Sequence, residues 1–261
     1  MGFKKGGGNF KGNMKENTIE QKFEITENRK IADMVYETVL VGDTSRVTSP
    51  GQFVSVSLGG FFLRRPFSVC DKSGGRLTLI YKTVGSGTKY MSSLKKGSVL
   101  NLLTGLGNGF EVKNSKDSPL LIGGGVGLPP LYFLAKCLTA EGKDVALIMG
   151  FGKSSEVFYE EKFKELGVRV AVTTADGSRG IKGFVTDALG LFTGYTYTYA
   201  CGPEQMLKAV WESTRTDGEY SFEERMGCGF GACMGCSRKT VGGYKKVCSD
   251  GPVFKKGEIL W

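Results

Sequence analysis

Four cysteines near the C-terminus place the strongest constraint on what this chain can fold into. Cys228, Cys233, Cys236 and Cys248 follow the spacing C-x4-C-x2-C-x11-C. The first three match the plant-type [2Fe–2S] spacing, in which a tight loop offers three thiolates and a more distant cysteine completes the site. The spacing therefore predicts that these four residues are the ligands of an iron–sulfur cluster.

Glycines lie among these cysteines, at Gly227, Gly229, Gly231 and Gly235. A loop that wraps a cluster must pass through positive φ and direct backbone N–H groups at sulfur, and glycine permits both. Zinc is the main alternative, although structural zinc sites usually use two C-x2-C-like pairs and here only one pair is so close. A disulfide framework would also account for the cysteines, but it is more typical of small secreted chains.

The composition excludes several classes of chemistry. The chain has 261 residues, enough for two domains or a domain with an appended module, and no histidine. Without histidine, Ser-His-Asp hydrolysis, His-ligated zinc catalysis and Rieske centres are excluded. No apolar run approaches the length of a membrane span, and the N-terminus lacks the apolar segment of a secretory signal. The seven cysteines, four of them in a cluster motif, point to a reducing cytoplasm, and no membrane partner is expected.

The net charge is +9, and part of it lies in the Lys-, Gly- and Asn-rich stretch Met1–Lys15. A basic tail can contact nucleic acid. The favoured interpretation is a disordered basic tail over residues 1–18 that includes an alternative start at Met14, with no nucleic-acid partner.

Residues 19–113 have the pattern of short strands separated by turn residues, with apolar and polar side chains alternating in several of them. Strands are expected at Gln21–Thr26, Ile31–Val41, Gln52–Leu58, Phe67–Asp71, Arg76–Thr83 and Ser98–Leu103, with one helix near Thr88–Leu94. Six strands at this spacing predict a small antiparallel barrel, which removes exposed edges by closing on itself.

Residues 114–218 instead alternate between strands and helices, which predicts a parallel sheet with helices on both faces. Strands are expected at Pro119–Gly123, Asp144–Gly150, Val168–Thr174 and Thr196–Ala200, and helices at Pro129–Leu138, Glu156–Glu165, Phe184–Leu189 and Pro203–Thr214. A last strand near Tyr220–Glu223 precedes the cysteines. Residues 219–261 are therefore expected to form a third, cluster-binding module.

Two motifs in the barrel region have the chemistry of a site for a pyrophosphate-bearing flavin. Arg65-Pro-Phe-Ser68 offers a guanidinium for phosphate, an aromatic ring, and a hydroxyl for the edge of a flavin. In Gly85-Ser-Gly-Thr88, glycines leave backbone N–H groups accessible at a helix N-terminus, where the dipole favours an anion. Each motif also has a purely structural interpretation, an ordinary strand start and an N-cap at Thr88. Their occurrence together and in this order favours the flavin.

Two further motifs are expected at the carboxyl edge of the parallel sheet. Leu121–Pro130 ends a strand in glycines and begins a helix at prolines, so its N–H groups face the crevice where nucleotides bind. It is not the G-x-G-x-x-G fingerprint, and a simple tight turn is the alternative. Ala200–Met206 has the same strand–turn–helix form and is expected to line the same crevice. Cys201 is either a buried small hydrophobe or a nicotinamide contact, whereas Cys70 and Cys137 are interpreted as packing residues.

Taken in order, these motifs resemble those of the ferredoxin–NADP⁺ reductase superfamily. Within it they are similar to the electron-transfer subunits of NAD-dependent dihydroorotate dehydrogenases, over roughly Glu20 to the C-terminus. The stretch Glu224–Cys236 is the most specific, because most members of the superfamily carry their cluster on a separate domain or lack one. The chain departs from the family pattern in the residues before Met14 and at Gly227, where a small residue such as alanine is common.

The resemblance implies the cofactors FAD, a [2Fe–2S] cluster and NAD, and assigns residues to them without assigning a general acid or base. The expected FAD residues are Arg65, Pro66, Phe67, Ser68, Ile80, Tyr81, Lys82, Gly87 and Thr88. The expected NAD residues are Gly123, Gly124, Gly125, Gly127, Cys201, Gly202 and Pro203. Lys153 and Ser154, just past the second expected strand of the nucleotide domain, could in principle meet the 2′-phosphate of NADP. NAD is therefore favoured over NADP on the resemblance alone.

The resemblance also implies a function. A partner catalytic subunit with FMN oxidises dihydroorotate to orotate in pyrimidine biosynthesis, within a heterotetramer of two copies of each chain. This chain then passes electrons through its cluster and FAD to NAD⁺, a conversion for which a flavin is suited because it exchanges both single electrons and hydride.

Three alternatives remain open from the sequence. A related NAD(P)H-dependent reductase subunit would serve another partner, of the transhydrogenase, sulfide dehydrogenase, hydrogenase or sulfite reductase type. A free-standing NADH-driven reductase would need no partner. A binding protein whose four cysteines hold a structural zinc ion would be colourless, and its basic tail would bind nucleic acid in a salt-dependent way.

Overall fold

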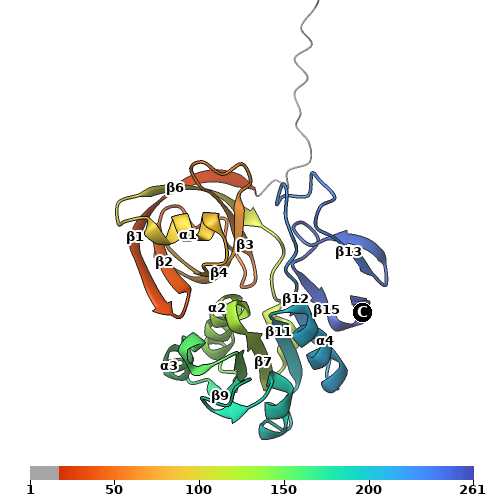
Figure 1. Ribbon diagram of the computed structural model, residues 1–261. Helices are drawn as coiled ribbons and strands as arrows, with labels where there is room; N and C mark the ends of the chain where they lie inside the picture. The colour runs from red at the N-terminus through yellow and green to blue at the C-terminus, as the bar shows by residue number, and fades with distance from the viewer. Residues whose placement is uncertain (1–17) are drawn as a thin grey trace, which may run out of the picture.

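The computed structural model describes residues 18–261. All but the last residue of the tail expected over residues 1–18 therefore lies outside the described part of the chain. Figure 1 shows a barrel, a sheet flanked by helices, and a C-terminal segment that lies beside both. None of the helices in residues 18–261 has the length and hydrophobicity needed to cross a membrane.

The N-terminal part is a closed antiparallel barrel of six strands in the order β1-β2-β5-β4-β3-β6, which confirms the predicted architecture. Its strands are β1 Ile19–Ala32, β2 Val35–Val41, β3 Phe53–Ser57, β4 Arg65–Ser73, β5 Arg76–Lys82 and β6 Val99–Leu106. Fully buried Leu40, Val54, Leu79 and Leu102 form the barrel core. Helix α1, Ser86–Ser93, lies across the barrel opening with Met91 buried in that core (Figure 1).

The single strand expected over Ile31–Val41 is wrong, because the chain turns at Asp33–Met34 between β1 and β2. Met34 has φ 58°, a left-handed conformation that favours glycine or asparagine. The sequence has neither at this position, and so no turn signal marks it. The turn is held from outside: the Asp33 N–H donates to the Ser155 carbonyl at 2.9 Å, and the Met34 carbonyl accepts from Thr83.

The second sheet has seven strands in the order β10-β9-β8-β7-β11-β12-β15. The strands from β10 to β12 are parallel, as predicted, and β15 is antiparallel to β12. The bounds are β7 Pro119–Gly124, β8 Ala146–Phe151, β9 Arg169–Thr174, β10 Ile181–Lys182, β11 Tyr197–Cys201, β12 Gly218–Ser221 and β15 Val253–Lys255.

Helices cover both faces of this sheet, as predicted. The helices are α2 Leu128–Ala140, α3 Glu160–Glu165 and α4 Glu204–Ser213, with short 3₁₀ helices η1 Val112–Ser115, η2 Gly125–Gly127, η3 Ser154–Glu156, η4 Val185–Leu191 and η5 Lys256–Glu258. Leu121 of β7 packs with α2 and α3 on one face, whereas Leu120 and Ile122 pack with η4 and α4 on the other. Successive side chains of a strand point to opposite faces, so β7 alone contributes to both cores.

Two expected helices differ in the structure. The helix expected at Phe184–Leu189 is the 3₁₀ helix η4, and the one expected at Glu156–Glu165 begins only at Glu160. Tyr159, before α3, has φ 64°, which an α-helix cannot accommodate.

The C-terminal segment is built into the second sheet. It forms the hairpin β13 Ser237–Thr240 and β14 Gly243–Lys246, and then β15, which pairs with β12. The boundary expected between residues 218 and 219 lies inside β12, so the sheet and the cluster segment share this strand and its partner.

The barrel and the sheet also share a core. Val35, Cys70 and Ile80 of the barrel pack with Leu131 and Leu134 of α2. Because α2 lies between the barrel and β7, the two parts form one continuous hydrophobic cluster.

Candidate functional site

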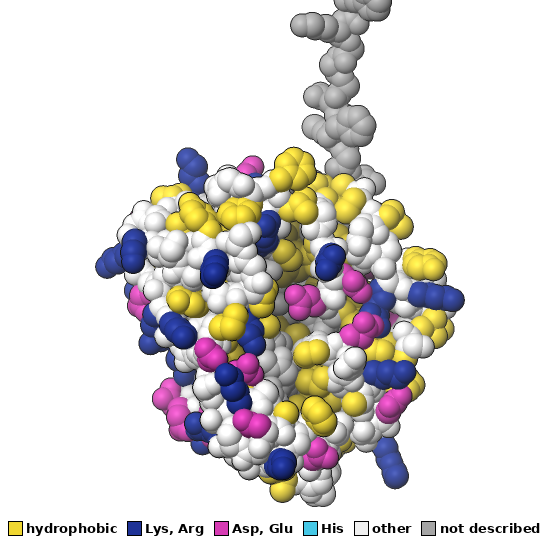
Figure 2. Space-filling view, in the orientation of Figure 1, with side chains coloured by type: hydrophobic (Ala, Val, Ile, Leu, Met, Phe, Trp, Pro, Cys, Tyr) yellow, Lys and Arg dark blue, Asp and Glu magenta, His cyan; other side chains and the backbone are white. Residues whose placement is uncertain are grey.

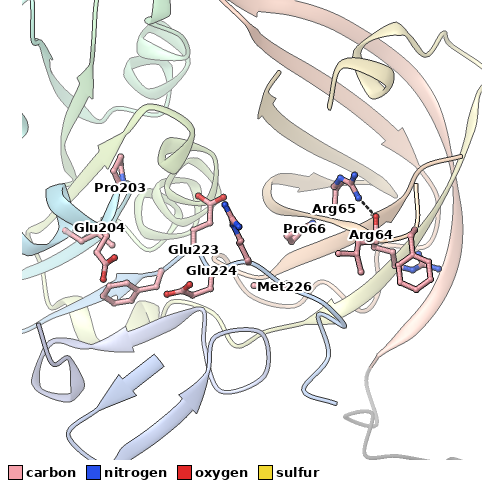
Figure 3. A pocket seen from close by; sticks show the side chains of 14 residues that line it. Arg64, Arg65, Pro66, Pro203, Glu204, Glu223, Glu224 and Met226 are labelled. Atoms are coloured by element: carbon pink, nitrogen blue, oxygen red, sulfur yellow. Dashed lines mark hydrogen bonds between the residues drawn. The ribbon is translucent and has the colours of Figure 1, made fainter. Parts of the chain in front are cut away.

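A cavity of about 760 Å³ lies where the barrel, the second sheet and the C-terminal segment meet. Figure 2 shows the surface hollowed here, and Figure 3 shows Arg65 on one side, with Pro203 and Glu204 opposite. Its lining residues are Phe62, Leu63, Arg64, Arg65, Pro66, Gly202, Pro203, Glu204, Leu207, Phe222, Glu223, Glu224, Arg225 and Met226. The structure thus brings the start of the predicted flavin motif together with the predicted nucleotide turn at Gly202–Pro203.

Arg65 lies beside the N-terminus of α1. Its guanidinium donates to the Leu63 carbonyl and lies 5.1 Å from the centroid of the Phe61 ring. A Cβ at Gly87 would lie 2.8 Å from Arg65 Nε, so only glycine lets the helix approach the guanidinium this closely. The first turn of α1 contains no acidic residue and its N-cap has no side-chain hydrogen bond. A guanidinium next to free N–H groups at a helix N-terminus suits a pyrophosphate.

The structural alternative of an N-cap at Thr88 is wrong, because α1 begins at Ser86 with Gly85 as its N-cap. The Thr88 hydroxyl accepts from the backbone N–H groups of Val84 and Gly85, at 3.1 and 3.2 Å. Thr88 therefore fixes the backbone of the loop that enters α1.

Two predicted flavin residues, Phe67 and Tyr81, form an aromatic pair with ring centroids 5.3 Å apart. Tyr81 is buried at the barrel centre, and its hydroxyl lies 3.4 Å from Asn28 Oδ1. Burial raises the pKa of Tyr81 to about 12. Its side chain supports the barrel, whereas half-buried Phe67 lies nearer the surface.

Of the nine predicted flavin residues, only Arg65 and Pro66 line the cavity. Ile80 is buried in the core shared by the two parts, and Lys82 forms an ion pair with Glu156 at 3.1 Å across the same interface. Ser68 is half-buried on β4, opposite Phe53 of β3.

The predicted glycine turn after β7 packs closely against the turn after β11. A side chain at Gly127 would collide with the Cys201 carbonyl oxygen, and a Cβ at Gly124 would lie 3.1 Å from Pro203 Cδ. Gly125 has φ 50°, a left-handed conformation that favours glycine. Both turns stand at the carboxyl edge of adjacent parallel strands, where nucleotides bind in open α/β sheets.

Cys201 is buried in the same core as α2, consistent with its interpretation as a small hydrophobe. Burial raises the pKa of its thiol to about 12, so the group is neutral at physiological pH.

The residues after β8 bear on nucleotide choice. Lys153 forms an ion pair with Asp33 at 3.0 Å, and Ser154 N–H donates to Ser178 Oγ at 2.7 Å. Glu156 accepts from the Gly152 N–H at 3.0 Å. The lysine that would neutralise a 2′-phosphate is thus already paired with a carboxylate from the barrel.

The sequence reasoning missed the segment Phe222–Met226, which lines the cavity between β12 and the first cluster cysteine. It also missed Arg238, whose guanidinium lies 3.9 Å from the centroid of the Phe222 ring and 2.8 Å from Glu204. The stretch Glu224-Arg-Met was a sequence signal, because it belongs to the motif that carries the family resemblance.

The four predicted cluster ligands fall into two pairs. The Cys233 N–H donates to Cys228 Sγ at 3.3 Å, and the Cys248 N–H donates to Cys236 Sγ at 3.4 Å. Within residues 18–261, no group of three or more Cys, Asp or Glu side chains has the arrangement of a metal-ion site. Two pairs of thiols suit a dinuclear cluster, whereas a structural zinc site needs four ligands around one ion. All seven cysteines are free, which excludes the disulfide framework.

Backbone groups prepare these thiols for a metal. Burial raises the pKa of Cys228, but N–H groups of Cys233, Phe230 and Ala232 donate to its sulfur and bring the pKa down to about 7. Burial and the neighbouring Cys236 raise the pKa of Cys248 to about 12. A bound cation deprotonates such thiols outright.

Of the four glycines in the predicted loop, Gly229 and Gly231 have positive φ, at 79° and 92°. Gly231 also lies against Ser249, because a Cβ there would be 3.0 Å from Ser249 Cβ. Gly227 and Gly235 do not need glycine's conformational freedom. Both lie next to Cys233: a Cβ added at Gly227 would be 3.4 Å from the Cys233 sulfur, and one added at Gly235 would be 3.6 Å from it.

The barrel and the nucleotide sheet meet at one cavity, and the four-cysteine loop begins two residues beyond its lining residue Met226. Together they define a flavin- and iron–sulfur-dependent reductase linked to a nicotinamide nucleotide. Residues 223–260 match the iron–sulfur cluster binding domain of dihydroorotate dehydrogenase B, and residues 121–212 match the oxidoreductase NAD-binding domain.

Whole-chain relatives agree. The electron transfer subunits of dihydroorotate dehydrogenase B (NAD(+)) from Bacillus mycoides and Bacillus cereus are 42% and 41% identical to this chain, over 92% of it and 98% of each relative. The chain belongs to this family of electron-transfer subunits, and it uses FAD, a [2Fe–2S] cluster and NAD.

Among solved structures, an NADH-dependent reduced ferredoxin-NADP oxidoreductase has a TM-score of 0.84 and 33% identity, over 92% of this chain and 90% of that one. A ferredoxin NADP⁺ reductase from Neisseria gonorrhoeae with bound FAD and NADP has a TM-score of 0.64 and 16% identity, over 76% and 90%. The second likeness shows the fold alone.

Proposed function

We propose that this chain links NAD⁺ to an FMN-containing catalytic subunit that oxidises dihydroorotate in pyrimidine biosynthesis. The two chains would assemble as a heterotetramer with two copies of each. When bound, the cluster carries single electrons and FAD exchanges both single electrons and hydride, so the chain joins a partner's one-electron chemistry to a two-electron nucleotide.

The observation that carries the proposal is the continuity of one short segment. Phe222–Met226 lines the cavity between the flavin motif and the nucleotide turn, and Cys228 follows two residues later. The cluster loop therefore starts at the wall of the proposed flavin–nucleotide cavity. A chain that moves electrons between a cluster and a flavin requires the two sites to lie close together.

In this proposal the residues of the chain bind and orient the cofactors and the nucleotide. Arg65 and the first turn of α1 hold phosphate, the turns at Gly125–Gly127 and Gly202–Pro203 form the nucleotide crevice, and the paired cysteines hold the cluster. We assign no side chain as a general acid or base, and the sequence contains no histidine.

The test is anaerobic purification of the native complex, followed by an assay of NAD⁺ reduction driven by dihydroorotate. Reduction together with a co-purifying FMN protein is the expected result. If NADH reduces the flavin and cluster but dihydroorotate does nothing, the partner assignment is wrong while the electron-transfer assignment stands.

The second candidate is a reductase subunit that serves another partner, and the observation that favours it is the likeness to the ferredoxin-NADP oxidoreductase. In that case the native complex would reduce NADP⁺ with reduced ferredoxin and NADH. The dihydroorotate assay distinguishes the two candidates, since only the first responds to that substrate.

A further inference from the structure

Ser237 directly follows the cluster ligand Cys236, and its hydroxyl is buried. Within residues 18–261, Ser237 Oγ has no hydrogen-bond partner. A buried hydroxyl without a partner is unfavourable, and native proteins almost always satisfy such groups. The position therefore calls for an acceptor that the chain itself does not supply.

The register of the β13–β14 hairpin shows which way Ser237 faces. Ser237 pairs directly with Lys246, and side chains opposite each other in a ladder lie on the same face. Lys246 Nζ donates to the Gly231 carbonyl at 2.6 Å, so this face meets the cluster loop. The Ser237 N–H donates to the Met234 carbonyl, also in that loop.

The next residue confirms the assignment of faces. Arg238 points to the other side of β13, where it stacks on Phe222 and pairs with Glu204. Successive side chains of a strand alternate, so Ser237 is directed away from this aromatic and ionic cluster. A cluster bound at this loop would offer its sulfurs as acceptors on this face.

We propose that the Ser237 hydroxyl donates a hydrogen bond to a sulfur of the [2Fe–2S] cluster and thereby raises its reduction potential. A donor stabilises the extra negative charge of the reduced cluster, and hydrogen bonds to sulfur are among the factors that set cluster potentials. Ser237 is a tuning residue in this proposal and holds no iron. The proposal depends on the cluster and not on which partner supplies electrons.

The test compares Ser237→Ala with Ser249→Ala in the full chain loaded with FAD and cluster. Ser249 is a matched control, because it directly follows the ligand Cys248 while its hydroxyl already bonds Asp250 Oδ1 at 3.4 Å. The midpoint potential is measured by redox titration followed by EPR. We expect a more negative potential in Ser237→Ala only. Equal potentials in wild type and Ser237→Ala would overturn the proposal.

A second measurement detects the proton itself. In ENDOR spectra of the reduced cluster, an exchangeable proton coupling should disappear in Ser237→Ala and persist in Ser249→Ala. Both measurements report on loaded clusters, so partial loading does not obscure them.

If the Ser237→Ala variant does not bind the cluster, Ser237→Thr and Ser237→Val are compared instead. These two side chains have nearly the same shape, and only threonine carries a hydroxyl. A threonine variant that alone retains the cluster or the wild-type potential supports the proposal. Indistinguishable threonine and valine variants would overturn it.

Discussion

Arg65 and Arg64 are neighbours at the cavity wall, but the structure gives them different tasks. Arg65 lies against Gly87 in the first turn of α1. Arg64 instead forms an ion pair with Glu20 and donates a hydrogen bond to the Asn101 carbonyl. Of these two guanidiniums, that of Arg65 lies at the helix N-terminus, where we propose that it meets a phosphate.

We predict that Arg65→Ala weakens FAD binding about 10- to 100-fold, since a hydrogen bond to a charged group contributes about 1.5–3 kcal/mol. The dissociation constant can be measured by titrating flavin-free protein and following flavin fluorescence. Arg64→Ala is the control and should bind FAD nearly as wild type does. Equal FAD affinity in the Arg65 and Arg64 variants would remove Arg65 from the phosphate site.

Cys233→Ser should abolish or destabilise the cluster and leave FAD bound, because Cys233 pairs with Cys228 at the loop and does not line the cavity. Iron analysis and the visible spectrum measure the two cofactors separately. Cys137→Ser, on α2, is the control and should retain both. Normal iron content in Cys233→Ser would contradict the ligand assignment.

Nucleotide choice gives a third prediction at this scale. Asp33→Asn releases Lys153 from its ion pair, so kcat/KM for NADPH relative to NADH should rise about two- to fivefold, the size expected for an exposed pair. Asp43→Asn, a loop carboxylate bonded by Gln21, provides the control. An unchanged ratio would show that Lys153 does not reach the nucleotide.

At the scale of elements, a buried carboxylate joins the barrel to the second sheet. Glu37 of β2 is only 2% exposed and accepts from Arg29 Nη2 at 2.6 Å, Lys162 Nζ at 3.1 Å and the Tyr159 hydroxyl. Burial acts to raise the pKa of Glu37, but hydrogen bonds from Tyr159 and Arg29 and the charge of Lys162 outweigh it and lower the pKa.

Because the pKa of Glu37 is lower in the folded state, its contribution to stability is present above its usual pKa of 4.5 and is lost as the pH falls through the folded value. Glu37→Gln should therefore lower the free energy of unfolding at pH 7 by about 1.5–3 kcal/mol, and by less near pH 4. Denaturant titrations at both pH values measure the difference, with the exposed Glu24→Gln as control. A pH-independent difference would show that the charge of Glu37 is not what stabilises the interface.

The contact between Tyr159 and Glu37 explains why the sequence predicted the start of α3 too early. Tyr159 takes its left-handed conformation beside this interface, and its hydroxyl reaches Glu37 of another sheet, 122 residues away in the chain. Local periodicity continues through Tyr159, so the sequence predicted one longer helix. The turn at Met34 failed for a similar reason, since its fixed partner is Ser155.

At the scale of the whole molecule, the cluster segment and the nucleotide sheet form one unit. Cys236 and Cys248 share a core with Tyr220 of β12 and Phe254 of β15, and these two strands pair. Metal binding at this site is therefore coupled to the packing of the sheet edge.

Anaerobic removal of the cluster should speed amide hydrogen exchange in β12 and β15 and leave β1 and β2 unchanged. Loss of the metal releases the ligands that fix this core, whereas the barrel keeps its own core. Exchange followed by mass spectrometry measures both regions in one sample. Equal protection of β15 with and without the cluster would show that the sheet edge is stable by itself.

The local features of this protein could be predicted from its sequence. Cysteine spacing identified the cluster loop, strand and helix alternation identified the barrel and the parallel sheet, and motif order identified the family. Which side chains meet could be read only from the folded chain. In the fold, Tyr81 and Ile80 are buried core residues, and Phe222–Met226 lines the cavity. The hydroxyl of Ser237 is buried without a hydrogen-bond partner in residues 18–261. Spacing and periodicity are properties of neighbouring residues, whereas burial and partnership depend on contacts between segments far apart in the chain.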